Sequence, residues 1–219
     1  MARKKNITSD KIIELYMDQV LMGNNTPHTI YAFSKNNDFD ESDFYKFFNS
    51  FETLEKKVFA IFCSKTVQLL LQNDDYKTYD AKSKLLSFYY TFFELLSANR
   101  SYVILKLKQN KNKLESLKLL SKLRKEFQDY ISAEIHTDKI DFKNKTVNKI
   151  QDKGFLEASW MHLLFTLQFW LDDQSENFEK TDIFIEKSVK ASFDLRDITP
   201  LQSVFDFAKF LWKEKMPSV

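Results

Sequence analysis

Glycine, proline and cysteine are scarce in this chain. Its 219 residues include only 2 Gly, 3 Pro and 1 Cys. Sheet proteins of this length need many tight turns, and tight turns use Gly and Pro. The scarcity of both therefore predicts long helices joined by polar loops. The single cysteine, Cys63, excludes an internal disulfide framework and favours a reducing compartment.

A strong net charge and a long apolar run are also missing. The net charge is +2, so nothing global marks nucleic acid or a membrane as a partner. The N-terminus, MARKKNITSD, lacks the apolar core of a signal peptide. The longest apolar-rich run, 85–96, is too short to span a bilayer. We therefore expect a soluble, cytoplasmic protein without membrane insertion.

Apolar and aromatic residues, in contrast, are plentiful. Apolar residues make up 43% of the chain, which is enough for a packed core and excludes a disordered chain. The 22 Phe stand out because Phe is not a strong helix former. Their number predicts wide buried faces or an apolar cavity in an all-α fold.

Apolar periodicity divides the chain into about ten helices and no strand. The predicted helices cover 9–21, 28–36, 41–49, 51–73, 81–98, 102–108, 114–135, 155–171, 181–195 and 201–213. Segment 146–153 is ambiguous, and Gly154 is either a kink or a boundary. Thr26, which precedes Pro27, is predicted to cap the second helix, and Ser50 to cap the fourth.

The short helices near the N-terminus have the geometry of a helix-turn-helix, in which the second short helix enters the DNA major groove. The stretch 33–54, FSKNNDFDESDFYKFFNSFETL, resembles the head of the TetR family of transcriptional regulators. There an IAK helix precedes a GVS turn, and a helix of the form LYxYFxSKEEL follows. The positions that carry the resemblance are Phe33, Lys35, Asp38, Phe39, Asp40, Tyr45, Phe48, Ser50, Glu52 and Leu54. The resemblance covers about residues 9–60.

The resemblance implies a TetR-like fold with two parts. Residues 1–50 would form a three-helix, helix-turn-helix DNA-binding head, and residues 51–219 a larger helical body for ligand binding and dimerisation. The implied function is a homodimeric repressor that binds a double-stranded DNA operator and releases it when a small hydrophobic ligand binds. The implied DNA-binding residues are Thr29, Tyr31, Lys35, Ser42, Tyr45, Lys46 and Asn49. Tyr45 would contact a phosphate, and Lys46 a base edge or the backbone.

Acidic residues set this head apart from the family pattern. Glu41, Ser42 and Asp43 replace a run that is usually small or basic, and residues 1–50 carry six basic and seven acidic side chains, a net charge of −1. Carboxylates repel phosphates, although they also stabilise the first turn of a helix. Two alternatives therefore stay open. One is a TetR-fold protein that binds a lipid or other hydrophobic molecule without DNA, and the other is a helical adaptor.

The body offers candidate ligand-binding residues. Ser87, Thr91 and Glu94 recur on one face of a helix, either as a chamber wall in which Glu94 orients a ligand or as the exposed edge of a buried helix. His162 is either a ligand contact or a hydrogen-bonded core residue. The candidate set is Tyr89, Phe92, Glu94, Trp160, His162 and Phe165. An aromatic lining of this kind suits an apolar or planar ligand.

The last helices are candidates for the dimer interface. Helices 155–171 and 181–195 are expected to pair with their copies, and Ser188 and Ala191 would permit close packing. Catalysis has no support, because the sequence has no Gly-rich phosphate loop, metal-ligand cluster or nucleophile elbow. We therefore expect no enzyme activity, metal or cofactor, and we expect Cys63 to be buried and inert.

Overall fold

The computed structural model describes residues 7–23, 27–108, 113–136 and 145–198. Over these residues the chain is built from helices and contains no strand, so the predicted all-α fold is confirmed. The helices are α1 (Ser9–Gly23), α2 (Ile30–Asn36), α3 (Glu41–Tyr45), α4 (Phe51–Leu71), α5 (Ala81–Ala98), α6 (Arg100–Leu107), α7 (Lys113–Leu119), α8 (Ser121–Tyr130), α9 (Lys145–Asp172) and α10 (Glu179–Ile198). Short 3-10 turns, Asp75–Thr78 and Glu176–Phe178, lie in two of the connections.

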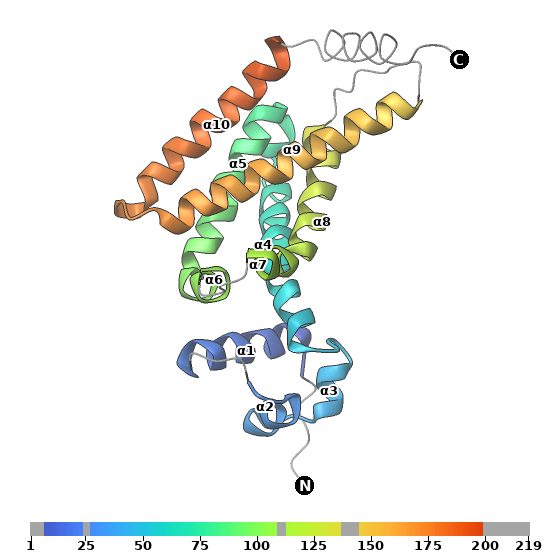
Figure 1. The fold of residues 1–219 in the computed structure, drawn as a ribbon, viewed down its shortest axis with the longest axis vertical. Helices are drawn as coiled ribbons and strands as arrows, with labels where there is room; N and C mark the ends of the chain where they lie inside the picture. Colours follow the sequence, from blue (N-terminus) through green and yellow to red (C-terminus); the bar gives the residue numbers. More distant parts are fainter. Residues whose placement is uncertain (1–6, 24–26, 109–112, 137–144, 199–219) are drawn as a thin grey trace, which may run out of the picture.

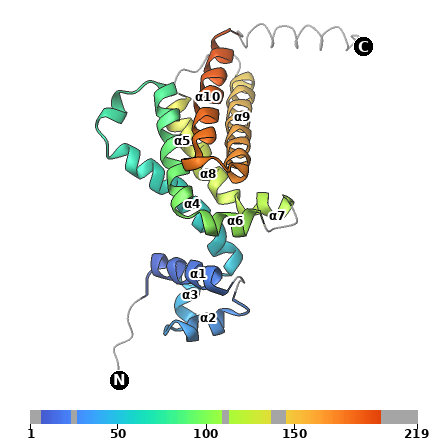
Figure 2. The same ribbon diagram turned by 90° about the vertical axis from the view of Figure 1, so that its left-hand side faces the viewer.

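The helices form a small head at one end of a larger body (Figure 1). Helices α1, α2 and α3 make the head, and α4 runs from the head into the body, where it packs against α5 and α8. Helices α9 and α10 form an antiparallel pair on the outside of the body, and α10 packs on α5 (Figure 2). The predicted order, a head of short helices followed by a larger helical body, is confirmed.

Local capping decides where the head helices begin and end. Thr29, and not Thr26, caps α2, because its hydroxyl accepts a hydrogen bond from the Ala32 backbone N–H at 3.1 Å. Helix α2 therefore starts two residues later than predicted. Helix α3 ends at Tyr45, earlier than the predicted Asn49. The predicted cap of α4 is confirmed, since the Ser50 hydroxyl accepts from the Thr53 N–H at 3.2 Å.

The predicted bounds of the body helices agree with the structure in some cases and differ from it in others. The prediction for α5, 81–98, is confirmed residue by residue. The single helix predicted over 114–135 is wrong, because the chain forms α7, α8 and a π-helical turn, Ile131–Ile135. Helix α9 runs without interruption through Gly154, which is neither a kink nor a boundary. The predicted helix 201–213 lies outside the described residues.

Aromatic side chains fill the core of both parts. In the head, Phe33 and Phe44 are fully buried and pack edge to face with Phe51, the first residue of α4. In the body, Phe88 stacks on Tyr130 with ring centroids 4.5 Å apart. The many Phe residues thus serve wide buried faces, one of the two alternatives that their number predicted.

Cys63 is buried inside α4, and burial raises the pKa of its thiol. A thiol that stays protonated is a poor nucleophile. This agrees with the expectation that the residue is structural.

A buried ion pair joins the head to the body. The Lys106 ammonium on α6 lies 2.5 Å from the Glu55 carboxylate on α4, and both side chains are largely buried. Tyr16 on α1 donates its hydroxyl to the same carboxylate. The Lys106 ammonium also lies 5.4 Å from the centre of the Tyr16 ring. One carboxylate therefore connects three helices at the junction.

Among the described residues, none of the helices combines the length and the apolar character needed to cross a bilayer.

Candidate functional site

The head has the packing of a helix-turn-helix. Helices α2 and α3 pack against each other, and Phe33 and Phe44 fix their inner faces. Asp38, in the turn between them, has φ 56°, a left-handed conformation that Asp tolerates better than most residues. This is the position of the Gly in the GVS turn of the TetR pattern. Asp38 therefore provides the turn that the resemblance requires without a glycine.

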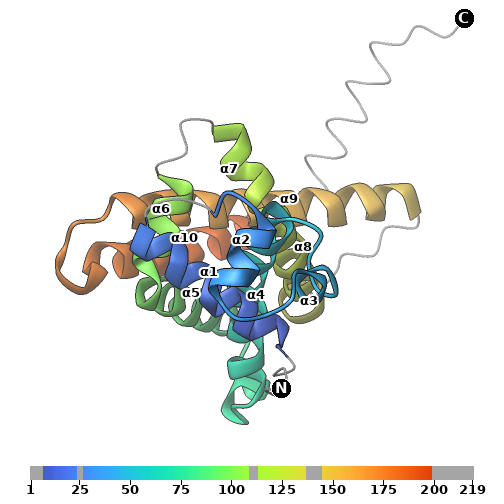
Figure 3. The same cartoon turned by 90° about the horizontal axis from the view of Figure 1, so that it is seen from below.

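All seven predicted DNA-binding residues lie on the exposed surface of the head. They are Thr29, Tyr31, Lys35, Ser42, Tyr45, Lys46 and Asn49. Figure 3 views the molecule from below, with the head in front of the body. The aromatic rings at positions 31 and 45 are 58% and 52% exposed, although large rings are usually buried. The resemblance thus selected residues whose side chains are exposed.

Carboxylates of α3 engage the side chains that would meet DNA. The Lys46 ammonium forms an ion pair with Asp43 at 2.6 Å, and its side chain is 67% exposed. The Tyr45 hydroxyl donates to Glu41 at 3.4 Å. The i,i+3 and i,i+4 spacings on a helical turn bring these partners together. A DNA phosphate would have to compete with a carboxylate for both Lys46 and Tyr45.

Other predicted DNA contacts have local structural roles. Thr29 caps α2, and the Asn49 side chain accepts a hydrogen bond from the Thr53 hydroxyl at 2.5 Å. The Lys35 ammonium lies 5.8 Å from the centre of the Tyr31 ring, a cation–π distance. These contacts hold the four side chains in place and leave them exposed to a partner.

In the body, Tyr89 and His162 meet in a polar chain between three helices. The fully buried Tyr89 hydroxyl on α5 lies 2.9 Å from His162 Nδ1 on α9. On its other side, His162 Nε2 lies 2.8 Å from the Ser188 hydroxyl on α10. Burial lowers the pKa of His162 to about 4 and raises that of Tyr89, so both groups are neutral near pH 7.

The remaining predicted ligand residues do not share this position. Phe92 and Trp160 are buried, and Trp160 packs against Phe127 with ring centroids 6.5 Å apart. Glu94 and Phe165 lie on the exposed surfaces of α5 and α9. Within the stripe Ser87, Thr91 and Glu94, only Glu94 is exposed, and the other two side chains are half-buried.

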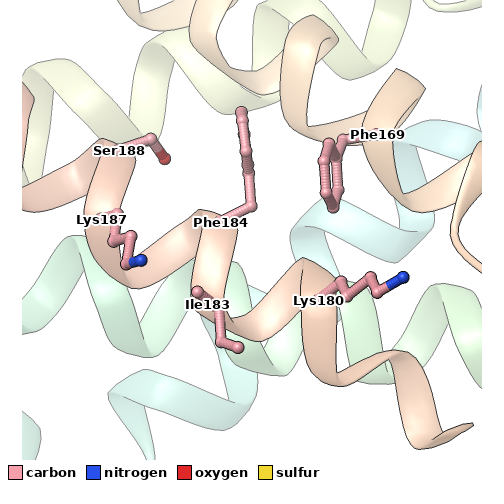
Figure 4. Close-up of a pocket in the computed structure, with 6 residues that line it drawn as sticks. All are labelled: Phe169, Lys180, Ile183, Phe184, Lys187 and Ser188. Atoms are coloured by element: carbon pink, nitrogen blue, oxygen red, sulfur yellow. The ribbon is translucent and has the colours of Figure 1, made fainter. Parts of the chain in front are cut away.

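A shallow apolar pocket opens between α9 and α10 (Figure 4). Its volume is about 490 Å³, and it is lined by Phe169, Lys180, Ile183, Phe184, Lys187 and Ser188. The rings of Phe169 and Phe184 stack with centroids 4.6 Å apart. Of the lining residues, Ser188 also belongs to the polar chain through His162. Sequence reasoning missed this pocket, because its two walls meet only after the chain turns between the helices.

The described part of the chain shows no group of three or more His, Cys, Asp or Glu side chains arranged to hold a metal ion. Some acidic residues of the head instead pair with neighbouring side chains. Asp43 and Glu41 are examples.

The fold and the head together define a class of protein: an all-helical protein with a helix-turn-helix head on a larger body. A comparison with family models agrees. The model described as "Tetracyclin repressor-like, C-terminal domain" matches residues 84–211, more than half of the chain. The chain therefore belongs to the tetracycline repressor-like (TetR) family, and its fold is TetR-like. A search of curated proteins found no match.

Proposed function

We propose that this protein is a homodimeric transcriptional regulator that binds operator DNA through its head. The observation that carries the proposal is the exposed surface of α2 and α3 on a chain of the TetR family. That surface presents Tyr45 and Lys46 side by side. A tyrosine hydroxyl and a lysine ammonium are common donors to phosphate oxygens and base edges. Such a regulator would act in the cytoplasm, as a repressor.

We also propose that a small hydrophobic ligand controls the regulator. The proposal is supported by the neutral chain Tyr89–His162–Ser188, which offers hydrogen bonds beside the apolar pocket of α9 and α10. Helix α5 carries Tyr89 and leads into α6, where Lys106 contacts Glu55. A shift of α5 on ligand binding would therefore act on the junction with the head.

Binding to a labelled duplex from the DNA upstream of the protein's own gene tests the DNA proposal. Fluorescence anisotropy at low and rising salt should show affinity that falls steeply with salt. Lys46→Ala should weaken binding by about tenfold, the effect of losing about 1.4 kcal/mol. Tyr45→Phe should weaken it by a smaller factor, because it removes a single hydroxyl.

Lys77→Ala is a matched control for Lys46→Ala. Lys77 forms an i,i+3 ion pair with Asp74 at 2.7 Å, as Lys46 does with Asp43, but it lies in the body. The control removes the same charge from the same kind of pair and should leave binding unchanged. Equal losses for Lys77→Ala and Lys46→Ala would mean that only the overall charge matters, and the head would have no specific role.

The second candidate function is a TetR-fold protein that binds a hydrophobic molecule without DNA. It is favoured by the ion pair of Lys46 with Asp43, which neutralises the cation where DNA would bind. Asp43→Asn distinguishes the candidates. If the head binds DNA, releasing Lys46 should raise affinity by about two- to fivefold, up to about 1 kcal/mol. If neither wild type nor Asp43→Asn binds DNA and the purified protein retains an apolar ligand, the second candidate is correct.

A further inference from the structure

The second short helix of the head begins with a carboxylate. Helix α3 starts at Glu41, whose side chain is half-buried, and Ser42 beside it is exposed. In a helix-turn-helix, the N-terminal residues of the second short helix contact base edges in the major groove. When the head binds DNA, Glu41 therefore lies where a base would be read.

Glu41 is less engaged than Asp43, the other carboxylate of this helix. The Tyr45 hydroxyl donates to Glu41 Oε1 at 3.4 Å, which is long for a hydrogen bond between two oxygens. Within the described part of the chain, Glu41 Oε2 has no hydrogen-bond or ion-pair partner. Asp43, in contrast, forms an ion pair with Lys46 at 2.6 Å. Most of the hydrogen-bonding capacity of Glu41 is thus unused in the free protein.

The negative charge of Glu41 restricts the bases that it can bind. A carboxylate accepts hydrogen bonds and cannot donate them. In the major groove, guanine presents the acceptors O6 and N7 and thymine the acceptor O4, so both bases repel a carboxylate. The donors are cytosine N4 and adenine N6, and adenine N6 lies beside the acceptor N7. Cytosine is therefore the base that a carboxylate favours.

We propose that Glu41 accepts a hydrogen bond from N4 of a cytosine in each half-site of the operator and so determines the base at that position. This role of Glu41 rests on the proposed binding of DNA by the head. It makes Glu41 a specificity-determining residue, in addition to the phosphate and base contacts of Tyr45 and Lys46.

A cytosine at this position would also release Tyr45. When Glu41 accepts a hydrogen bond from the base, its long bond with the Tyr45 hydroxyl can be exchanged, and the hydroxyl becomes available to a phosphate oxygen. On a sequence without the amino group, the carboxylate faces an acceptor or the backbone and is repelled. The acidic start of α3 thus penalises incorrect sequences more than the operator, which is a source of specificity.

Selection from a random duplex library, with purified wild type and with Glu41→Gln, tests this role. The wild type should enrich cytosine at one position of each half-site. In Glu41→Gln that position should change to adenine, because a glutamine amide matches both the N6 donor and the N7 acceptor of adenine. The other enriched positions should stay as they are in the wild type.

Two further variants control for charge and for the loss of the side chain. Asp43→Asn removes one charge from the same short helix and should keep cytosine at the position, since the Asp43 carboxylate is engaged by Lys46. Glu41→Ala removes the acceptor and should leave the position without a preferred base. Circular dichroism and thermal unfolding check that each variant is folded.

Fluorescence anisotropy with four duplexes that differ only at this position measures the size of the preference. The wild type should bind the cytosine duplex at least about fivefold more tightly than the adenine duplex. Glu41→Gln should reverse the order, and Asp43→Asn should keep the wild-type ratio.

The outcomes separate the role of Glu41 from the proposed function. If the wild type enriches a sequence and Glu41→Gln enriches the same bases at every position, the role of Glu41 is refuted and DNA binding by the head stands. An equal change of base in Asp43→Asn would also overturn the role, since charge alone would then set the preference. If the folded wild type enriches no sequence, DNA binding itself is refuted, and the role of Glu41 with it.

Discussion

The half-buried His162 makes the stability of the folded protein depend on pH. Its ring lies between the Tyr89 hydroxyl and the Ser188 hydroxyl, and burial lowers its pKa to about 4. In the unfolded chain the pKa returns to about 6.5. As the pH falls below about 6.5, the unfolded state takes up the proton first, so folding stability is lost between about pH 6.5 and pH 4.

The substitution His162→Gln should remove this loss. Glutamine can still form hydrogen bonds but does not titrate, so the free energy of unfolding should depend less on pH over that range. The difference from the wild type should reach about 3 kcal/mol between pH 7 and pH 4. Urea unfolding at several pH values measures it. His28→Gln, at an exposed position, is the control and should follow the wild type; a wild-type slope in His162→Gln would contradict the role of this residue.

At the residue scale, the sequence predicted which side chains are exposed better than it predicted which side chains they contact. The seven positions that the resemblance predicts to bind DNA are exposed. The acidic residues near Lys46 were also evident, because their partners lie within one helical turn. In contrast, the partners of His162 come from α5 and α10, far away along the chain. Local pattern contains no information about such contacts.

At the element scale, the junction of α1, α4 and α6 is the feature with the clearest energetic consequence. Lys106 and Glu55 form a largely buried ion pair, and Tyr16 donates to the same carboxylate. Removing one partner of a buried pair leaves the other charge uncompensated. This effect should exceed that of any exposed pair on the head.

Lys106→Met should therefore lower the free energy of unfolding by about 3 kcal/mol. Adding Glu55→Gln should recover part of the loss, because the remaining buried charge is then removed. Lys84→Met is a matched control, since Lys84 pairs with Glu134 at 2.8 Å inside the body. Both single variants should be destabilised in chemical unfolding, but only Lys106→Met should also alter DNA affinity. A loss below about 0.5 kcal/mol for Lys106→Met would contradict the junction's role.

The bounds of the helices show which sequence signals were sufficient to locate the start and end of a helix. Ala81–Ala98 was predicted correctly because a polar loop with a capping Asp80 precedes a long apolar run. Helix α3 was predicted too long because the aromatic run after Tyr45 suggested helix, while the backbone turns at Lys46 and Phe47. Gly154 suggested an interruption of α9, yet a single glycine costs a long helix only about 1 kcal/mol.

The sequence located the turn after α9, but the hydrogen bonds that stabilise this turn could not be predicted from it. Burial opposes ionisation of Asp173, but hydrogen bonds from Ser175 and Thr181 outweigh it and hold its pKa at about 2. Arg100 donates to the Trp170 carbonyl at 3.1 Å and so satisfies the end of α9. Arg100 and its acceptor are far apart in the sequence, so this hydrogen bond could be found only in the structure.

At the scale of the whole molecule, the order of head and body was predictable and the arrangement of the body was not. Short helices with an aromatic cluster preceded longer apolar helices, and the structure keeps that order. The outer face of α9 became visible only when α9 was placed relative to α4, α5 and α10 (Figure 1). In sequence, Met161 and Phe165 belong to a helix that is apolar nearly all round, so their exposure was hidden.

The two heads of the proposed dimer should meet DNA together. In a two-fold symmetric dimer, the two α3 helices should contact two inverted half-sites. Helix-turn-helix dimers bind half-sites whose centres lie about 34–36 Å apart, one turn of DNA. The operator of this protein should therefore be a palindrome.

Selection from a random duplex library at low salt tests that central claim most directly. The bound fraction, sequenced after several rounds with purified wild-type protein, should be enriched in two inverted half-sites with centres about 10 base pairs apart. Lys46→Ala under the same conditions should give weaker enrichment. A folded, dimeric wild type that enriches no sequence over the starting library would contradict the claim that this head reads DNA.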